Sequence, residues 1–528
     1  MDIDARNFSE ALPTVLRAIE ECDFVAMDME MTGLHADRAT MARGMDTLEE
    51  RYAKVRESAN KFAVLQVGLC AFRWTRQAAS DESAANSQLT ASAFNFWVFP
   101  RTRDNGHGGD VCHLFQVGSI EFLNTCDFDF NRAFRQGIPY LDDDMANAER
   151  DFLARQMERR DQNAAKESQG ARSRIRMNDV DPATREFLAY ALEQASGLVN
   201  GELGEVNADG ETETRHVVLK PTHAFARRLV YQEIEAAYPK IYVGKHQEDN
   251  ENPQGRRNDA RLRFTLSGLS AGELEHQRIM SDYQRDLAAL EESIGFSRVI
   301  AALRAAKKPL IGHNCLQDFC HLYGKFVRPL PATLEEFRDG FHEAFPMAID
   351  SKMIFENNRQ LRALVPNHAL GPCYETTGRQ AVFLRTNPEI RLDEASSRYK
   401  LAKSDTKGSQ ALEHEAGYDA LMTGVIFGRA AAAMGMTGCV WDSSLRTWSS
   451  AVAGTSFEAH TELFNKLYLM RLSESIDLAQ PNVEAERALV VRLCNFPKKT
   501  GTGHLRRVLS QRIGTRDIRV VWDNDTSV

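Results

Sequence analysis

Hydrophobic positions along this chain follow two different periods, and the change from one to the other predicts a mixed α/β protein. Apolar side chains repeat with helical spacing over residues 7–21, and the short apolar run that follows at 24–34 reads as a buried strand. Further strands are expected at 62–72, 94–100, 308–314 and 345–352, and further helices at 45–60, 120–123, 128–131, 296–305, 315–323 and 421–434. From this alternation we expect a mixed sheet covered by helices.

The middle of the chain interrupts this pattern. Residues 142–174 are rich in Arg, Asp, Glu, Gln and Ala with little apolar periodicity, which is typical of either a charged helix or a linker. A smaller group of elements follows, with helices at 184–192, 224–238 and 270–292 and a strand at 217–221. An insert of this length between two segments of one fold is too long for a loop, so it is predicted to be a domain.

Two carboxylates interrupt the apolar strand at 24–34. Asp28 and Glu30 are two residues apart, so on a strand both side chains point to the same face. Like charges held side by side repel each other and lose hydration, which a fold tolerates when a cation, usually a divalent metal, lies between them. A strand that ends at a solvated edge explains the same pair without a metal.

Three residues later in the chain supply the remaining components of such a metal site. Asp318 lies in the first turns of a helix that Asn314 is expected to cap, and Asp419 opens another helix, five residues after His414. Mg2+ prefers oxygen ligands, and two such ions about 4 Å apart hold the attacking and leaving oxygens of an in-line displacement. The His414 imidazole is a base of suitable pKa for the attacking water. This set predicts a two-metal phosphodiesterase.

Other residues near these motifs have more ordinary interpretations. Asp350 is either a further acidic ligand or, as the preferred interpretation, a cap at the end of a strand. His313 is expected to be structural. The His-Glu pairs at 342–343 and 414–415 lack a second His four residues on, which excludes zinc-protease chemistry.

Composition narrows the function classes. A net charge of -9 gives no general attraction to nucleic acid, so a site for a polyanion has to be a local feature. The nine cysteines form neither a Cys-x-x-Cys pair nor a zinc spacing, which indicates reduced thiols in an intracellular protein. No apolar run approaches the roughly 20 residues of a membrane span, and the N-terminus lacks the plan of a signal peptide, so no membrane association is expected.

Three motifs resemble those of a known family. The residues at 27–30 (Met-Asp-Met-Glu), 312–318 (Gly-His-Asn-x-x-x-Asp) and 414–419 (His-Glu-Ala-Gly-Tyr-Asp) are similar to the exonuclease motifs of the DEDD superfamily, in its His-containing (DEDDh) subgroup. The nearer resemblance is to the poly(A)-specific ribonuclease (PARN) family of deadenylases. It spans most of the chain and is supported by the stretches 128–141, 295–300 and 464–471.

The resemblance implies an RNase H-like DEDD exonuclease fold with a mixed sheet, interrupted by a small inserted α/β domain of the Arg-x-x-x-His type and followed by a partial RNA-recognition motif (RRM). The nuclease domain is expected to be split between 1–150 and 293–480, with the insert and its charged flanking linkers at 151–292. The first half of the RRM is expected at 485–528. In the insert, Gln232 stands where the signature His would follow Arg228. A helical dimerisation or lid element is the alternative for the insert.

The resemblance also implies an activity and a set of site residues. The activity is Mg2+-dependent 3'-to-5' exoribonuclease cleavage of mRNA poly(A) tails, releasing 5'-AMP through two ions, with Mn2+ as a substitute. The implied catalytic residues are Asp28, Glu30, Asp318, His414 and Asp419, of which the four carboxylates are the metal ligands. The implied contacts to the terminal nucleotides of single-stranded RNA are Met31, Leu34, Ile120, Phe122, Asn314 and Lys352, with ordinary core packing as the alternative for each.

Partners and compartment follow from the same resemblance. It implies a homodimer, residence in nucleus and cytoplasm, and an mRNA 5' cap stacked on Trp522 in the RRM. Two other functions stay open at this point. One is trimming of the 3' ends of small or noncoding RNAs, and the other is RNA binding by a regulator that keeps the fold without turnover, although all five catalytic positions are filled.

Overall fold

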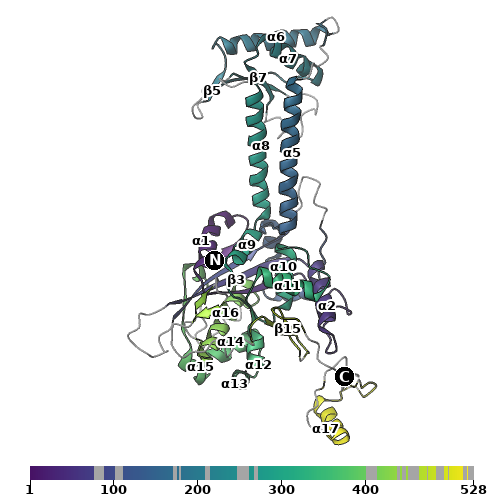
Figure 1. Cartoon of the computed structure of the whole chain (residues 1–528), viewed down its shortest axis with the longest axis vertical. Coiled ribbons are helices and arrows are strands. Elements are labelled where there is room, and N and C mark those ends of the chain that lie inside the picture. Colours follow the sequence, from purple (N-terminus) through teal and green to yellow (C-terminus); the bar gives the residue numbers. More distant parts are fainter. Residues whose placement is uncertain are drawn as a thin grey trace. The chain divides into compact units, whose positions relative to one another are not determined.

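The computed structural model of the 528-residue chain consists of two compact units, Met1–Ala146 with Glu292–Val528, and Asn147–Glu291 (Figure 1). The described residues are 1–75, 88–101, 111–169, 175–177, 180–207, 214–246, 261–266, 271–399, 413–436, 440–442, 447–449, 463–472, 474–482, 491, 493–497, 499–514 and 520.

A mixed sheet forms the centre of the first unit, in the order β1-β4-β3-β2-β9-β10, with β11 beside β4. Strands β2, β3 and β4 pair antiparallel, whereas the other pairings are parallel. The prediction of a mixed α/β fold is therefore confirmed. The strand bounds are β1 Asp2–Ile3, β2 Phe24–Met31, β3 Val64–Thr75, β4 Gln88–Trp97, β9 Leu310–Gly312, β10 Ala348–Asp350 and β11 Glu389–Leu392.

Helices cover both faces of this sheet because alternate side chains of its strands feed two apolar cores. In β2, Val25 and Met27 belong to the core under α1, α2, α9, α10 and α11, while Phe24 and Ala26 belong to the core under α12 to α16. The bounds are α1 Phe8–Glu21, α2 Leu48–Lys61, α3 Val117–Thr125, α4 Phe130–Gln136, α9 Ser297–Ala306, α10 Leu316–Phe326, α11 Leu334–Ala344, α12 Ser351–Asn357, α13 Arg359–Leu364, α14 Leu370–Arg379, α15 Ala381–Thr386 and α16 Ala416–Ala433.

Helix α16 approaches the sheet so closely that two glycines are required where they meet, one in the sheet and one in the helix. A Cβ at Gly68 of β3 would lie 1.8 Å from the backbone oxygen of Ala416, and a Cβ at Gly424 would lie 1.9 Å from the Phe72 ring. Because Gly68 is the β3 partner of Asp28, this approach brings the first turn of α16 beside the carboxylates of β2.

Replacing Gly68 by alanine is expected to destabilise the first unit by about 3 kcal/mol or more, since the clash is with backbone that cannot rotate away. Chemical denaturation measures this change. Gly118, where nothing lies within 4 Å of an added Cβ, provides the matched control, and Gly118→Ala should cost far less. Equal stability of the two variants would contradict the close packing of α16.

The second unit has its own four-stranded antiparallel sheet, in the order β5-β6-β8-β7. The charged stretch expected as a helix or a linker is a helix, α5, which runs antiparallel beside α8 (Figure 1). Ion pairs join the two helices, with Arg150 to Glu291 at 3.4 Å and Asp161 to His276 at 2.9 Å. The bounds are α5 Asp143–Gln169, α6 Pro182–Val199, β5 Glu205–Asn207, β6 Thr214–Val218, α7 Ala224–Ala237, β7 Ile241–Lys245, β8 Leu262–Leu266 and α8 Ala271–Ile294.

The C-terminal region of the chain is described in pieces. Two short hairpins pair β12 (Val440–Asp442) with β13 (Thr447–Ser449) and β14 (Lys466–Leu467) with β15 (Ile476–Asp477). A helix, α17 (Thr502–Ile513), lies in the region expected to be the first half of an RRM. Trp522 lies outside the described residues. Among the described helices, none has the length and apolar character required to cross a bilayer.

Candidate active site

Strand β2 presents two carboxylates on the face that α16 covers. Asp28 and Glu30 continue the alternation of Phe24 and Ala26, so their side chains leave the sheet on the side of the second apolar core. Both side chains are half-buried. Strand β2 lies between β3 and β9 in the sheet, and its pairing with β9 covers Val25 and Ala26, before the two carboxylates.

Helix α10 carries Asp318 in its first turn and is fixed at that end by Asp350. The Asp350 carboxylate is fully buried and accepts hydrogen bonds from the backbone N–H groups of Asn314 (2.8 Å), Cys315 (3.3 Å), Lys352 (3.0 Å) and Tyr468 (3.0 Å). The prediction that Asp350 is a cap is confirmed. A carboxylate at a helix N-terminus is also favoured by the helix dipole, which suits Asp318.

The prediction that Asn314 is the N-cap of α10 is wrong. The N-cap residue of α10 is Cys315, and Asn314 is exposed in a left-handed conformation with φ of +60°. Asp350 accepts the N–H groups of Asn314 and Cys315, which precede the first residue of α10, and no cap hydrogen bond comes from the side chain of Cys315.

Helix α16 brings Asp419 to the same place. Its first turn is held by strand side chains, since Ala416 N–H donates to the Gln66 Oε1 atom (3.3 Å) and Gly417 N–H donates to the Asn95 Oδ1 atom (3.1 Å). His414 precedes the helix in a left-handed conformation with φ of +70°, and its backbone N–H donates to the Asp419 carboxylate at 3.2 Å.

The five residues expected to be catalytic are therefore brought together from three distant segments. Glu30, His414 and Asp419 each place one ligand atom within 4.8 Å of the other two, and the Nδ1 atom of His414 lies 4.0 Å from an Asp419 oxygen. The negative charges of Asp419, Asp318 and Glu30 contribute to the raised pKa of Asp28.

The electrostatics of this carboxylate cluster favour a bound cation. Burial, reinforced by the negative charges of Asp419 and Asp318, raises the pKa of Asp28 and of Glu30 well above the usual range. Burial also raises the pKa of Asp318 to about 7 and that of Asp419 to about 8. Four carboxyl groups that hinder one another's ionisation constitute a site that a divalent cation would relieve. Oxygen donors of this kind suit Mg2+ or Mn2+.

His414 is placed as a base beside these carboxylates. Burial lowers the pKa of its imidazole, so the ring is neutral near neutral pH and has a nitrogen free to take a proton. The Phe122 ring packs edge-on against this imidazole, with centroids 4.6 Å apart. The arrangement can hold a cation and accept a proton from a water next to it, which is the chemistry of metal-assisted hydrolysis.

The residues expected to line an RNA pocket fall into two groups. Leu34, Asn314 and Phe122 are exposed, Ile120 is half-buried, and Lys352 is half-buried with its Nζ atom 4.9 Å from the centroid of the Tyr468 ring. Met31 is buried in the apolar core on the opposite face of the sheet from Glu30. For Met31 the structure therefore fits ordinary core packing, because its place in the strand directs it away from the carboxylates.

Several residues that build this site have no role in the sequence-based prediction. Gln66 and Asn95 stand out in the sequence only as polar residues inside strongly apolar strands, which is the signal that could have identified them. Arg398 pairs with Asp2 and with Glu415, the residue after His414. The sequence gives no signal for these three residues, because charged residues in loops and near chain ends are common.

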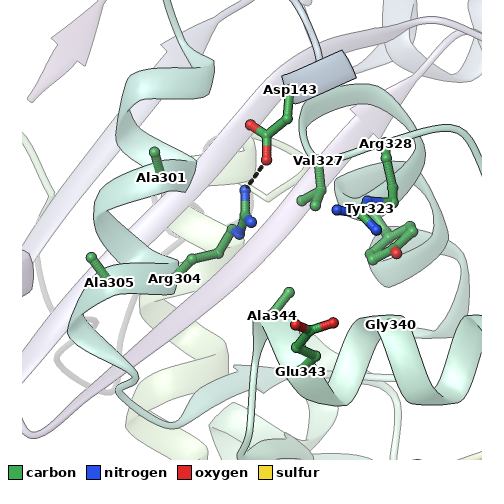
Figure 2. Close-up of a pocket in the computed structure, with 10 residues that line it drawn as sticks. All are labelled: Asp143, Ala301, Arg304, Ala305, Tyr323, Val327, Arg328, Gly340, Glu343 and Ala344. Carbon is green, nitrogen blue, oxygen red and sulfur yellow. Dashed lines mark hydrogen bonds and ion pairs between the residues drawn. The ribbon is translucent and has the colours of Figure 1, made fainter. Parts of the chain in front are cut away.

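A separate cavity of about 500 Å³ lies between α9, α10 and α11 (Figure 2). Arg304 on its wall pairs with Asp143 at 2.5 Å, and Tyr323, Arg328 and Glu343 face the same space. None of the five candidate catalytic residues lines it. Its two arginines are balanced by two carboxylates, so the lining has no net preference for an anion.

Comparison with known proteins agrees with the geometry of the carboxylate cluster. Residues 3–427 match the model of the CAF1 family of ribonucleases, a span that includes all of β2, α10 and the first turn of α16. The chain belongs to this family. As a CAF1 family ribonuclease, it has all five candidate catalytic residues within the matched region.

Curated relatives of this CAF1 family ribonuclease cover its whole length. The poly(A)-specific ribonuclease PARN of Xenopus laevis is 30% identical over 100% of this chain and 76% of its own length. The protein of the same name from Homo sapiens is 31% identical over 100% of this chain and 75% of its own. The one from Arabidopsis thaliana is 27% identical over 99% of this chain and 76% of its own.

Proposed function

We propose that this chain is a divalent-metal-dependent 3'-to-5' exoribonuclease that shortens mRNA poly(A) tails and releases 5'-AMP. The observation that carries the proposal is the carboxylate cluster, in which three segments that are far apart in the sequence place Asp28, Glu30, Asp318 and Asp419 around one another next to His414. The relatives named for poly(A)-specific ribonuclease support the substrate class.

The mechanism assigns each of these side chains a task. Two Mg2+ ions, for which Mn2+ can substitute, supply charge neutralisation and a more acidic water when they are bound. The four carboxylates of Asp28, Glu30, Asp318 and Asp419 would hold these ions. The neutral imidazole of His414 accepts the proton of the water that attacks the terminal phosphodiester, and the 3'-oxygen of the preceding nucleotide leaves. Repetition of this step removes one 5'-AMP at a time.

Substrate contacts are proposed for the residues that border the carboxylate cluster. Phe122 and Leu34 expose apolar surface on which single-stranded bases can stack, a contact worth roughly 1–3 kcal/mol per base. Ile120 and Asn314 extend this surface, and Lys352 offers a positive charge to a phosphate. Because Met31 is buried in the core, we propose no direct base contact for it.

The function is tested directly with RNA labelled at its 5' end. Incubation of oligo(A) with the protein and Mg2+ should give a ladder that shortens by single nucleotides, and EDTA should stop it. An oligonucleotide of mixed sequence, shortened as fast as oligo(A), would favour the alternative of a trimmer of small or noncoding RNAs. Binding of oligo(A) without any shortening would favour a non-catalytic RNA-binding regulator.

Replacing His414 by alanine is expected to lower kcat by a factor on the order of 10²–10⁴, the usual contribution of a general base. Metal binding should persist, because the four carboxylates remain. Single-turnover cleavage and Mn2+ binding, measured on the same preparation, separate the two effects. His368→Ala is the matched control, since that imidazole instead pairs with Glu356 at 3.1 Å outside the carboxylate cluster. An His414→Ala variant as active as this control would contradict the assigned role.

We also propose identities for the remaining regions of the chain. The second unit, Asn147–Glu291, is proposed to be an inserted domain of the Arg-x-x-x-His type. Its Gln232 carboxamide bonds to the backbone of Ile175, at 2.7 Å and 3.2 Å, which favours a structural, dimerising or lid role over RNA contact at that position. Light scattering of the purified chain tests the proposed homodimer.

The C-terminal residues from 485 are proposed to belong to an RRM, in which Trp522 would stack on an mRNA 5' cap. Residence in both nucleus and cytoplasm is proposed as well. Fluorescence titration of a cap analogue against the protein and a Trp522→Ala variant tests the cap site. Equal affinity of the two proteins for the analogue would exclude a cap site at Trp522.

A further inference from the structure

Glu415 lies between the candidate base His414 and the first turn of α16. Its carboxylate accepts hydrogen bonds from the Arg398 guanidinium and the Tyr399 hydroxyl. It is the N-cap residue of α16, yet its side chain does not cap the helix. Its backbone carbonyl accepts the N–H of Asp419 at 3.0 Å, so the position of Glu415 also sets that of Asp419.

His414, the residue before Glu415, has a backbone conformation that its surroundings must stabilise. His414 has a φ of +70°, which a residue with a Cβ adopts at a cost of about 1–3 kcal/mol and keeps only when its surroundings enforce it. The N–H of His414 donates to Asp419 on one side. On its C-terminal side the next residue is Glu415, whose side chain is fixed by Arg398 and Tyr399.

This support is anchored to the sheet and not only to the loop. Arg398 also pairs with Asp2 of β1 at 3.2 Å, and Asp2 in turn accepts hydrogen bonds from Asn95 (3.0 Å) and Trp97 (2.9 Å) of β4. All of these groups are partly shielded from water, so the interactions are stronger than those of an exposed pair.

Gly417, which has no Cβ, allows the Tyr399 hydroxyl to approach the start of α16. A Cβ at Gly417 would lie 2.5 Å from the Tyr399 hydroxyl oxygen and 2.7 Å from the Asn95 side chain. The backbone at 414–417 is thus held by two sets of bonds. The N–H groups of Ala416 and Gly417 donate to strand side chains, and the Glu415 carboxylate accepts from Arg398 and Tyr399.

We propose that Glu415, held by Arg398 and Tyr399, is a positioning residue that keeps His414 in its left-handed conformation with the imidazole directed at the carboxylate cluster. The bonds of its carboxylate are to Arg398 and Tyr399. The inference rests on the proposed function, because the readout is cleavage of RNA. It adds to that function a group that acts on the alignment of the base.

The test compares Arg398→Met and Glu415→Ala with the unmodified protein. Both variants should lower kcat about tenfold, the usual loss when an interaction behind a reactive group is removed, with KM, Mn2+ affinity and melting temperature unchanged. Arg398→Lys should restore most of the lost kcat. The matched control is Glu389→Gln, which breaks an exposed carboxylate–arginine contact with Arg391 and should leave kcat as it is.

A double-mutant cycle then asks whether the effect passes through His414. In a His414→Ala background, Arg398→Met should cost no further activity, because the group that it positions is gone. A tenfold loss in that background, a parallel loss of Mn2+ affinity, or full kcat in both single variants would overturn the inference. Unmodified protein that does not shorten oligo(A) would overturn the proposed function and this inference together, whereas fully active variants would overturn the inference alone.

Discussion

Asp28→Asn is expected to abolish RNA shortening while making the metal-free protein more stable. Activity should fall on the order of 10³-fold or more, because an amide cannot replace a carboxylate that holds a divalent cation and supports charge development at the phosphate. The fold should be intact, since Asp28 lies in a strand whose pairing depends on its backbone.

The gain in stability has a separate physical cause. In the absence of metal, Asp28 lies beside Glu30, Asp318 and Asp419, and its pKa is raised well above the usual range first by burial and then by those charges. An amide at this position carries no charge and relieves the repulsion. We expect the free energy of unfolding in EDTA to rise at pH values at which the carboxyl groups ionise.

Cleavage of labelled oligo(A) and chemical denaturation in EDTA measure the two effects on one preparation. Asp151→Asn, the same chemical change at an exposed position of α5, is the matched control and should alter neither quantity. Asp28→Asn with normal activity would refute the assignment of the site. Lost activity accompanied by lower stability would point instead to a damaged fold.

Metal-free protein is expected to lose stability as the pH rises, and Mg2+ is expected to restore it. The pKa of Asp318 is raised to about 7 and that of Asp419 to about 8, while in the unfolded chain both carboxyls titrate near 4. Between these limits the folded protein binds more protons than the unfolded chain. Stability is therefore complete below the unfolded pKa and is lost as the pH rises through the folded values.

The free energy of unfolding should fall by up to about 6 kcal/mol between about pH 5 and pH 8 in EDTA. In Mg2+ the slope should be much smaller, because the cation replaces the protons that the carboxylates lose. Urea titrations at several pH values, with EDTA and with Mg2+, measure both slopes. An Asp318→Asn variant should have a reduced slope in EDTA. Identical slopes with and without Mg2+ would contradict a metal site among these residues.

The four carboxylates of this cluster were the most predictable feature of the molecule, for a simple physical reason. Side chains alternate along a strand, so Asp28 and Glu30 share a face whatever surrounds them. Asp318 and Asp419 sit where a strand or loop turns into an apolar helix, a place where carboxylates are favoured by the helix dipole. Local rules therefore sufficed to nominate all four.

The supporting interactions depend on contacts between distant segments and could not be read locally. Asp350, which lies 36 residues after Asn314, accepts the N–H of Asn314, and the N-cap residue of α10 is Cys315. Met31 follows the alternation into the core instead of toward RNA. The contact of Glu415 with Arg398 joins residues whose sequence neighbourhood gives no sign of the pairing.

Anomalous diffraction from crystals soaked in Mn2+ tests the central claim most directly. The account predicts anomalous peaks about 2 Å from carboxylate oxygens of Asp28, Glu30, Asp318 and Asp419, with the His414 imidazole beside them, and loss of a peak in Asp28→Asn. Protein that shortens oligo(A) while its Mn2+ peaks lie elsewhere, with none among these four carboxylates, would contradict it.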